Sequence, residues 1–270
     1  MKKLFSILAL TLLVLAMSAC TDSGSEETRT FSAQMLNNSV NVTDGTSDKV
    51  SSSILSMKMD VTNSTLSIDY SVPVTGNTVA NVVVNDAQLV PDNELNCYTF
   101  TSANAGTGIT NFKGYYSPQG CLHIEFDAFG THHVSSNADL YFPYSSITMT
   151  KTEDENATPV ESNKAEVNIS IDPSNMKAVL AMGNFALENI SGDIQSVYFR
   201  NLNAIATGDG FKVTTTEPVE STDGDYTITD LEAFVTGNGR VINATFTIKT
   251  KNNADVKVYN GILHGTQFAQ

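Results

Sequence analysis

The chain alternates between apolar and polar positions over most of its length. Leu66, Ile68 and Tyr70 are separated by polar residues, and residues 122–127 and 255–258 show the same period of two. Alternation of this kind is typical of β-strands that have one face in a core and the other in solvent. Beyond residue 20, no stretch has the apolar spacing of an amphipathic helix over three turns. The pattern therefore predicts an all-β protein.

Short segments rich in Gly, Asn, Asp and Pro separate the predicted strands, for example residues 91–93, 117–120, 207–210 and 222–225. Gly and Asn adopt positive φ at low cost, so these segments favour tight turns. Strands joined by tight turns form antiparallel hairpins. The sequence therefore predicts antiparallel sheets, arranged as a meander barrel or, alternatively, as a β-sandwich.

Polar motifs recur along the chain at a nearly constant spacing. The turn Asp60–Asn63 has a counterpart 112 residues later at Asp172–Asn175, and Asn85 has one 116 residues later at Asn201. The strands between these motifs follow in the same order. Two further pairs are the turns that end at Gly120 and Gly239 and the stretches 137–140 and 253–256.

This recurrence predicts an internal duplication of a unit of about 115 residues, a period too long for a solenoid. Chance similarity between β-rich segments is the alternative explanation. We predict a signal peptide over residues 1–19, a flexible tether over 20–29, one β domain over 30–143 and a second over 144–270. Each domain is expected to contain roughly seven or eight strands.

The first twenty residues have the order of an export signal. Lys2 and Lys3 precede an apolar run from Leu4 to Leu15, and small residues then lead to Cys20. This order is typical of a secretory signal peptide, and the run is shorter than the ~20 residues that a spanning helix needs. An ordinary cleaved signal with a chance cysteine is the alternative to a lipid anchor.

The Ser-Ala-Cys sequence that ends at Cys20 resembles the lipobox of bacterial lipoproteins, although Met17 stands where that pattern usually has Leu. The resemblance implies cleavage before Cys20 and attachment of lipid, such as palmitate, to this residue. Asp22, Glu26 and Glu27 follow in a polar tether. Together with the β-rich body, these features resemble the outer-membrane and surface lipoproteins of Bacteroidota.

In that group an acidic run after the lipid cysteine directs export to the cell surface. The run is interrupted here, so both the cell surface and the periplasmic face remain open. The predicted strand count of each domain is also similar to that of calycin-like (lipocalin-like) barrels. The chain has no tryptophan, so the Gly-x-Trp motif of lipocalins is missing.

The charge of the chain excludes one class of partner. The formal net charge is −14, and loss of Lys2 and Lys3 with the signal makes the mature chain more acidic still. Such a surface repels phosphate backbones, so we predict no nucleic-acid binding. The acidity can serve solubility or divalent-cation binding. The predicted partners are the membrane, through the lipid anchor, and an unknown ligand or envelope protein.

Cys97 and Cys121 are candidates for a disulfide, because export would place them in an oxidising compartment. In a simple meander they would lie at the starts of strands two apart, roughly 9–10 Å from each other. Bridged Cα atoms usually lie within ~7 Å. The bond would therefore require strand curling or another strand order.

One polar cluster is a candidate metal site. His123, Glu125 and Asp127 share a strand face, and His132 and His133 follow a turn. Imidazole and carboxylate groups at this spacing can ligate a transition metal. The other face of the strand is apolar and the second unit lacks the cluster. We therefore predict a solvent-facing strand with no metal and no catalytic role.

The sequence contains no nucleophile elbow, P-loop, His-Glu-x-x-His or EF-hand pattern. We therefore predict a non-catalytic, lipid-anchored envelope protein without a cofactor that binds a small ligand, a glycan or a protein partner. A structural or adhesion subunit of an envelope complex is the alternative. Exposed aromatic residues would favour glycan or protein recognition. The aromatic candidates can equally belong to the core, and they are Tyr115, Tyr116, Tyr141, Phe142 and Tyr144.

Overall fold

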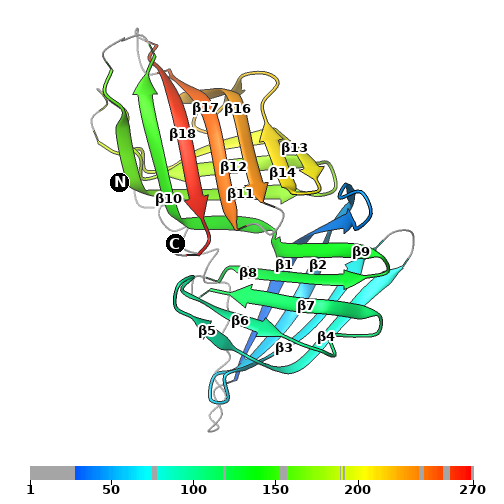
Figure 1. The fold of residues 1–270 in the computed structure, drawn as a ribbon. Helices are drawn as coiled ribbons and strands as arrows, with labels where there is room; N and C mark the ends of the chain where they lie inside the picture. The colour runs from blue at the N-terminus through cyan, green and yellow to red at the C-terminus, as the bar shows by residue number, and fades with distance from the viewer. Residues whose placement is uncertain are drawn as a thin grey trace.

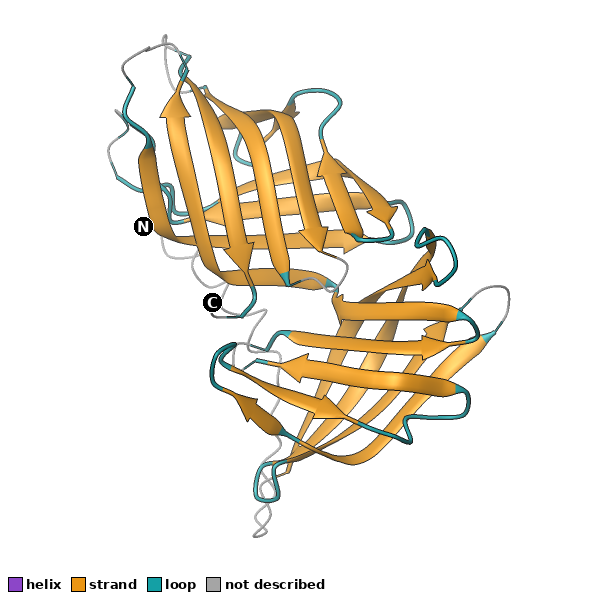
Figure 2. Ribbon diagram, in the orientation of Figure 1, coloured by secondary structure: helices purple, strands orange, loops and turns teal. Residues whose placement is uncertain are grey.

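The protein is built from β-strands, which form two nine-stranded antiparallel sheets one after the other along the chain (Figure 1). In the described part of the chain, Figure 2 shows strands and loops without a helix, so no helix there could span a bilayer. The all-β prediction is confirmed. The predicted signal peptide, Cys20 and the tether up to residue 27 lie outside the described residues. The computed structural model describes residues 28–74, 78–117, 120–152, 157–188, 190, 192–236, 240–251 and 256–268.

The first sheet is a nearly closed meander barrel. β1 pairs with both β2 and β9, and β4 and β5 are the two edges. Near the opening, the amide of Val83 donates a hydrogen bond to the carbonyl of Ala105 at 2.8 Å. The strands are β1 (Thr28–Asn41), β2 (Ser47–Asp60), β3 (Thr65–Pro73), β4 (Val79–Gln88), β5 (Val90–Asp92), β6 (Cys97–Thr101), β7 (Ile109–Tyr116), β8 (Leu122–Ala128) and β9 (Thr131–Asn137).

The second sheet closes completely. β10 pairs with both β11 and β18, and a direct pairing of β14 with β16 completes a ring of eight strands that leaves β15 at its side. The meander-barrel prediction is thereby confirmed over the sandwich. The strands are β10 (Asp139–Lys151), β11 (Val160–Asp172), β12 (Lys177–Gly183), β13 (Val197–Thr207), β14 (Gly210–Thr214), β15 (Val219–Glu220), β16 (Tyr226–Thr236), β17 (Val241–Thr250) and β18 (Val258–Thr266).

The alternation in the sequence decides which side chains fill each barrel. In β3, Leu66, Ile68 and Tyr70 are buried. Asp69 and Ser71, which alternate with them along the strand, face outward. Inward side chains of this kind form one continuous apolar cluster in each barrel. Full burial of such a side chain stabilises the fold by ~1.5–3 kcal/mol. Each barrel is therefore organised around a packed core.

The two barrels share β-bulges at matching places. Asp86 in β4 and Asn201 in β13 sit in bulges opposite the preceding strand, with φ of 53° and 60°. Asn111 in β7 and Asp230 in β16 also sit in bulges, each opposite the strand that follows, with φ of 54° and 53°. Asn and Asp tolerate this left-handed conformation better than most side chains. The shared strand order and bulges support the proposal of a duplication.

The structure refines the pairing of the repeat motifs. The turns Asp60–Asn63 and Asp172–Asn175 do occupy matching places. In each, the Asn side chain donates to Oδ2 of the Asp, at 2.8 and 2.9 Å respectively. Asn201, by contrast, corresponds through its bulge to Asp86 and not to its neighbour Asn85. A shift of one residue of this kind is invisible in a sequence match between irregular segments.

The sheets divide at Ala138, which precedes the predicted domain boundary after residue 143. Residues 139–142 already pair with β11 of the second sheet. The stretch 137–140 therefore spans the junction between the two sheets. Its match at 253–256 stays a prediction, because Val256, just before β18, is the one described residue of that segment. Residues 253–255 and Gly239 lie outside the described residues.

The barrels contact each other through β1 (Figure 1). Leu36 points away from its own barrel and belongs to the apolar cluster of the second. Asn38, on the same face of β1, donates from Nδ2 to the carbonyl of Thr207 at 3.1 Å. The first strand of the first barrel thus supplies part of the core of the second.

Candidate functional site

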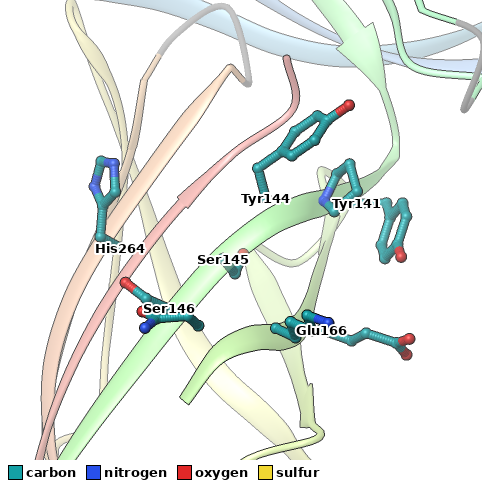
Figure 3. Close-up of a pocket in the computed structure, with 9 residues that line it drawn as sticks. Tyr141, Tyr144, Ser145, Ser146, Glu166 and His264 are labelled. Atoms are coloured by element: carbon teal, nitrogen blue, oxygen red, sulfur yellow. The ribbon is translucent and has the colours of Figure 1, made fainter. Parts of the chain in front are cut away.

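A depression of about 520 Å³ lies on the outer surface of the second barrel, at a point where β10 separates from β11 (Figure 3). We call it the β10–β11 groove. Its walls come from β10, from the start of β11 and from the neighbouring strand β18. The residues labelled in Figure 3 are Tyr141, Tyr144, Ser145, Ser146, Glu166 and His264.

A bulge in β10 opens the groove. Phe142 and Ser145 remain paired with β11, but Pro143 and Tyr144 between them face the single residue Glu166. Proline has no amide hydrogen for the ladder, so it is tolerated in a strand where pairing is interrupted. The Ser145 hydroxyl donates to the carbonyl of Phe142 at 2.7 Å, so this hydrogen bond spans the bulge.

The first barrel fixes the orientation of Tyr144. Nδ2 of Asn96, in the turn between β5 and β6, donates to the Tyr144 hydroxyl at 3.2 Å. The Tyr144 side chain nevertheless remains 38% exposed, so its ring is available to a ligand. The aromatic wall of the groove is therefore positioned by residues from both barrels.

The groove continues across the barrel surface as a second, much smaller depression. The two share Tyr141 and Glu166. From Tyr141, one rung of the sheet runs through Asn168 and Ala181 to Tyr198, which lines the far end. The residues between the two tyrosines are short, so the path between the rings is not blocked by large side chains.

The polar groups of the groove are balanced in charge. Lys164 and Glu166 contribute one cation and one anion, and the remaining polar side chains are hydroxyl, amide and imidazole groups. His264 is held through Nδ1 by Oδ1 of Asn243 at 2.7 Å. Burial and the nearby Glu166 carboxylate raise the pKa of Tyr141, so its hydroxyl is a protonated donor at neutral pH.

The histidine candidates lie in three different environments. The prediction that His123 faces solvent is wrong, because its side chain is completely buried. The outer face of β8 is covered at this point: the Tyr115 ring lies 5.4 Å from His123, and Arg240 of the second barrel lies over Tyr115. Nε2 of His123 is 2.8 Å from Oε1 of Glu125.

Burial lowers the pKa of His123, although the Glu125 carboxylate opposes the shift. Burial also acts to raise the pKa of Glu125, but hydrogen bonds from His123 and Lys113 outweigh it and lower this pKa to about 2. Lys113 Nζ lies 2.6 Å from the second carboxylate oxygen. Glu125 therefore remains ionised and is already bonded on both oxygens.

The other two histidines have partners other than His123. Nδ1 of His132 lies 2.6 Å from Oδ1 of Asp127, in a partly exposed pair. His133 points into the first barrel, where its ring stacks on Phe126 and its Nδ1 bonds to the Ser39 hydroxyl at 3.0 Å. Burial lowers the pKa of His133 to about 4. Among the described residues, no group of three or more His, Cys, Asp or Glu side chains is placed to hold a metal ion.

Cys97 and Cys121 lie in one small buried cluster beneath Phe268, and both carry free thiols. Burial raises the pKa of Cys97, and raises that of Cys121 to about 11. The structure thus brings the two side chains to the same outer face of the first barrel. A disulfide formed between them on export stays a prediction.

The five aromatic candidates divide between interface, core and groove. Tyr115 lies at the contact between barrels, Tyr116 packs against the first core, and Phe142 is fully buried in the second. Tyr141 and Tyr144 line the groove. No sequence pattern marks the polar lining residues, and the local signal at the groove is Pro143 inside an alternating strand.

No protein-family profile matches the chain, and no curated protein matches it. A crystal structure of a Bacteroides fragilis protein, provisionally named as an outer membrane protein, aligns with 88% of this chain and 97% of its own. The two are 13% identical, with a TM-score of 0.38.

Proposed function

We propose that the chain is a lipid-anchored, non-catalytic binding protein of the cell envelope, which takes its ligand or partner in the β10–β11 groove. One observation carries the proposal. A bulge exposes Tyr144 beside Tyr141 and neutral polar groups on the outside of a barrel whose interior is packed. Ligand sites combine aromatic surface with a few placed polar groups in this way.

The anchor rests on the sequence before the first barrel. The lipobox-like end of the signal places Cys20 only a few residues before Thr28, where β1 begins. Such a tether would hold the first barrel close to an outer-membrane leaflet, on the cell surface or the periplasmic face. The acidic surface of the chain would keep the anchored protein soluble.

The arrangement of the groove favours binding over catalysis. A serine nucleophile needs an adjacent base. In the described groove, however, the Ser145 hydroxyl donates to a backbone carbonyl. Ser146 lies opposite His264 in the ladder of β10 and β18, but no hydrogen bond joins these two described side chains. The proposal therefore assigns the groove to recognition.

The anchor is tested by Cys20→Ala in the exporting cell. We expect the variant to appear as soluble protein or as uncleaved precursor, and to lose the label from a fatty-acid probe. A variant that stays in the membrane fraction with the same label as the wild type would disprove the lipid anchor.

The groove is tested by photo-crosslinking in intact cells. A benzophenone amino acid replaces Ser146 inside the groove or, as the control, the exposed Thr245 on β17 outside it. We expect a light-dependent adduct from the groove position only. Equal results from the two positions would favour the alternative, a structural or adhesion subunit that does not use this groove.

A further inference from the structure

We infer that the β10–β11 groove binds an uncharged oligosaccharide. This inference rests on the proposed function, because it names the ligand class for the same groove. It depends on three features of the described residues: the row of tyrosine rings, the balanced polar lining and the support that the first barrel gives to Tyr144.

The tyrosine rings mark a path of useful length. Tyr144 and Tyr141 line the main groove, and Tyr198 lies on the same rung as Tyr141, three strand spacings or ~14 Å away. Sugar rings present flat C–H faces that stack on aromatic rings. A path with rings at intervals and short side chains between them suits a chain of several sugar units better than a single small molecule.

The polar lining matches neutral hydroxyl groups. A sugar hydroxyl both donates and accepts, so it is satisfied by the mixed set that Ser146, Asn163, Lys164 and Glu166 provide. Because the charges of Lys164 and Glu166 offset each other, the groove has no excess cation to hold a carboxylate or sulfate. The chain's net charge of −14 further disfavours an anionic glycan.

The lining is less suited to a protein partner. The centres of protein interfaces are apolar and desolvated, and they carry large anchoring side chains. The aliphatic residues at the groove, such as Val167 and Met182, belong to the barrel core and are not exposed. Apart from Pro143 and Ala181, the lining residues that are not buried are aromatic or polar.

The hydrogen bond from Asn96 reduces the cost of binding. It holds the Tyr144 hydroxyl at 3.2 Å and so orients the ring before any ligand arrives. A ring that is already ordered loses less conformational entropy when a sugar stacks on it. Asn96 is therefore a positioning residue for the sugar site.

The test uses the mature lipoprotein, purified in detergent, and isothermal titration with neutral oligomers of glucose, mannose, xylose and N-acetylglucosamine. Galacturonic acid oligomers serve as the charged comparison. We expect at least one neutral oligomer to bind, and Tyr144→Ala to weaken it by about tenfold or more. The matched control is Tyr98→Ala, since Tyr98 is also 38% exposed but lies on the first barrel outside the groove. Asn96→Ala is expected to weaken binding by a few-fold while Tyr144 remains present.

Binding of no neutral oligomer would overturn the inference, as would a preference for galacturonic acid or equal affinities of the Tyr144 and Tyr98 variants. The crosslinking result at Ser146 then distinguishes failure of the ligand class from failure of the groove as a binding site. A protein adduct without sugar binding would leave the groove as a binding site and reject only the ligand class. The absence of both adduct and sugar binding would reject the proposed function as well.

Discussion

The guanidinium of Arg240 in the second barrel lies over the ring of Tyr115 in the first, with Cζ 3.8 Å from the ring centroid. Phe268 borders the same group, 5.1 Å from Arg240 and 6.3 Å from Tyr115, measured to ring centroids. Tyr115 on β7 is thus contacted by two segments of the second barrel. A desolvated cation–π contact of this kind contributes about 2 kcal/mol.

Replacing Arg240 with Ala should therefore weaken the contact between the barrels. We expect the free energy of unfolding to fall by about 1–3 kcal/mol, measured by urea denaturation. Arg200→Ala is the control, because Arg200 is exposed on β13, and it should change the free energy by less than ~0.5 kcal/mol. Equal effects of the two substitutions would show that the Arg240 contact is not stabilising.

Acid should destabilise the protein through His133. Its pKa is about 4 in the folded state, below the ordinary value of 6.5, so the unfolded chain binds a proton more readily. The stability that depends on neutral His133 is fully present above pH 6.5 and is lost as the pH falls toward 4. The loss is expected to be about 3 kcal/mol, from the size of the shift.

Chemical denaturation at pH 7 and at pH 4.5 checks this expectation. The difference in unfolding free energy between the two values should shrink in His133→Gln. His264→Gln, on the outer face of the second barrel, is the control and should keep the wild-type difference. An unchanged difference in His133→Gln would contradict the assignment.

His123 should matter for stability but not for metal binding. Since His123 is buried and bonded to Glu125, we expect His123→Ala to cost about 1–3 kcal/mol, more than a surface position would. Zinc and a chelator should both leave the melting temperature of the wild type unchanged in calorimetry. A rise with zinc that disappears in His123→Ala would instead establish a metal site.

The two buried thiols should resist alkylation. The thiolate is the reactive form, and burial raises the pKa of both Cys97 and Cys121. At pH 8 we expect iodoacetamide to label them at least about 100-fold more slowly in the folded protein than in urea. Phe268→Ala should speed the labelling, because Phe268 shares the small buried cluster with both thiols. A protein that labels in urea only after reductant is added would establish the predicted disulfide.

Much of the barrel architecture could be predicted from local patterns. Alternation shows directly that Leu66, Ile68 and Tyr70 share a face, and burial of that face then follows from their composition. The repeat match between Asn85 and Asn201 marked the neighbourhood of two of the bulges to within one residue. Their exact register could not be predicted, because it depends on pairing with the neighbouring strand.

The contacts between barrels could not be predicted in the same way. Alternation assigns His123 to the outer face of β8, but it cannot show that residues more than 100 positions away cover that face. The same limit applies to Tyr144, whose orientation depends on Asn96 of the other barrel. Pro143 was the one local indication that β10 is interrupted at the groove.

On the export route proposed above, the position of Phe268 would set an order of events during secretion. A chain that crosses the inner membrane from its N-terminus delivers all of β1–β9 to the far side well before residue 268 emerges, and domains generally fold as units. During that interval the first barrel could form while Cys97 and Cys121 lack the side chain of Phe268 beside them. Folding enzymes of the envelope would reach these thiols most readily then, and arrival of the segment after β18 would end that access.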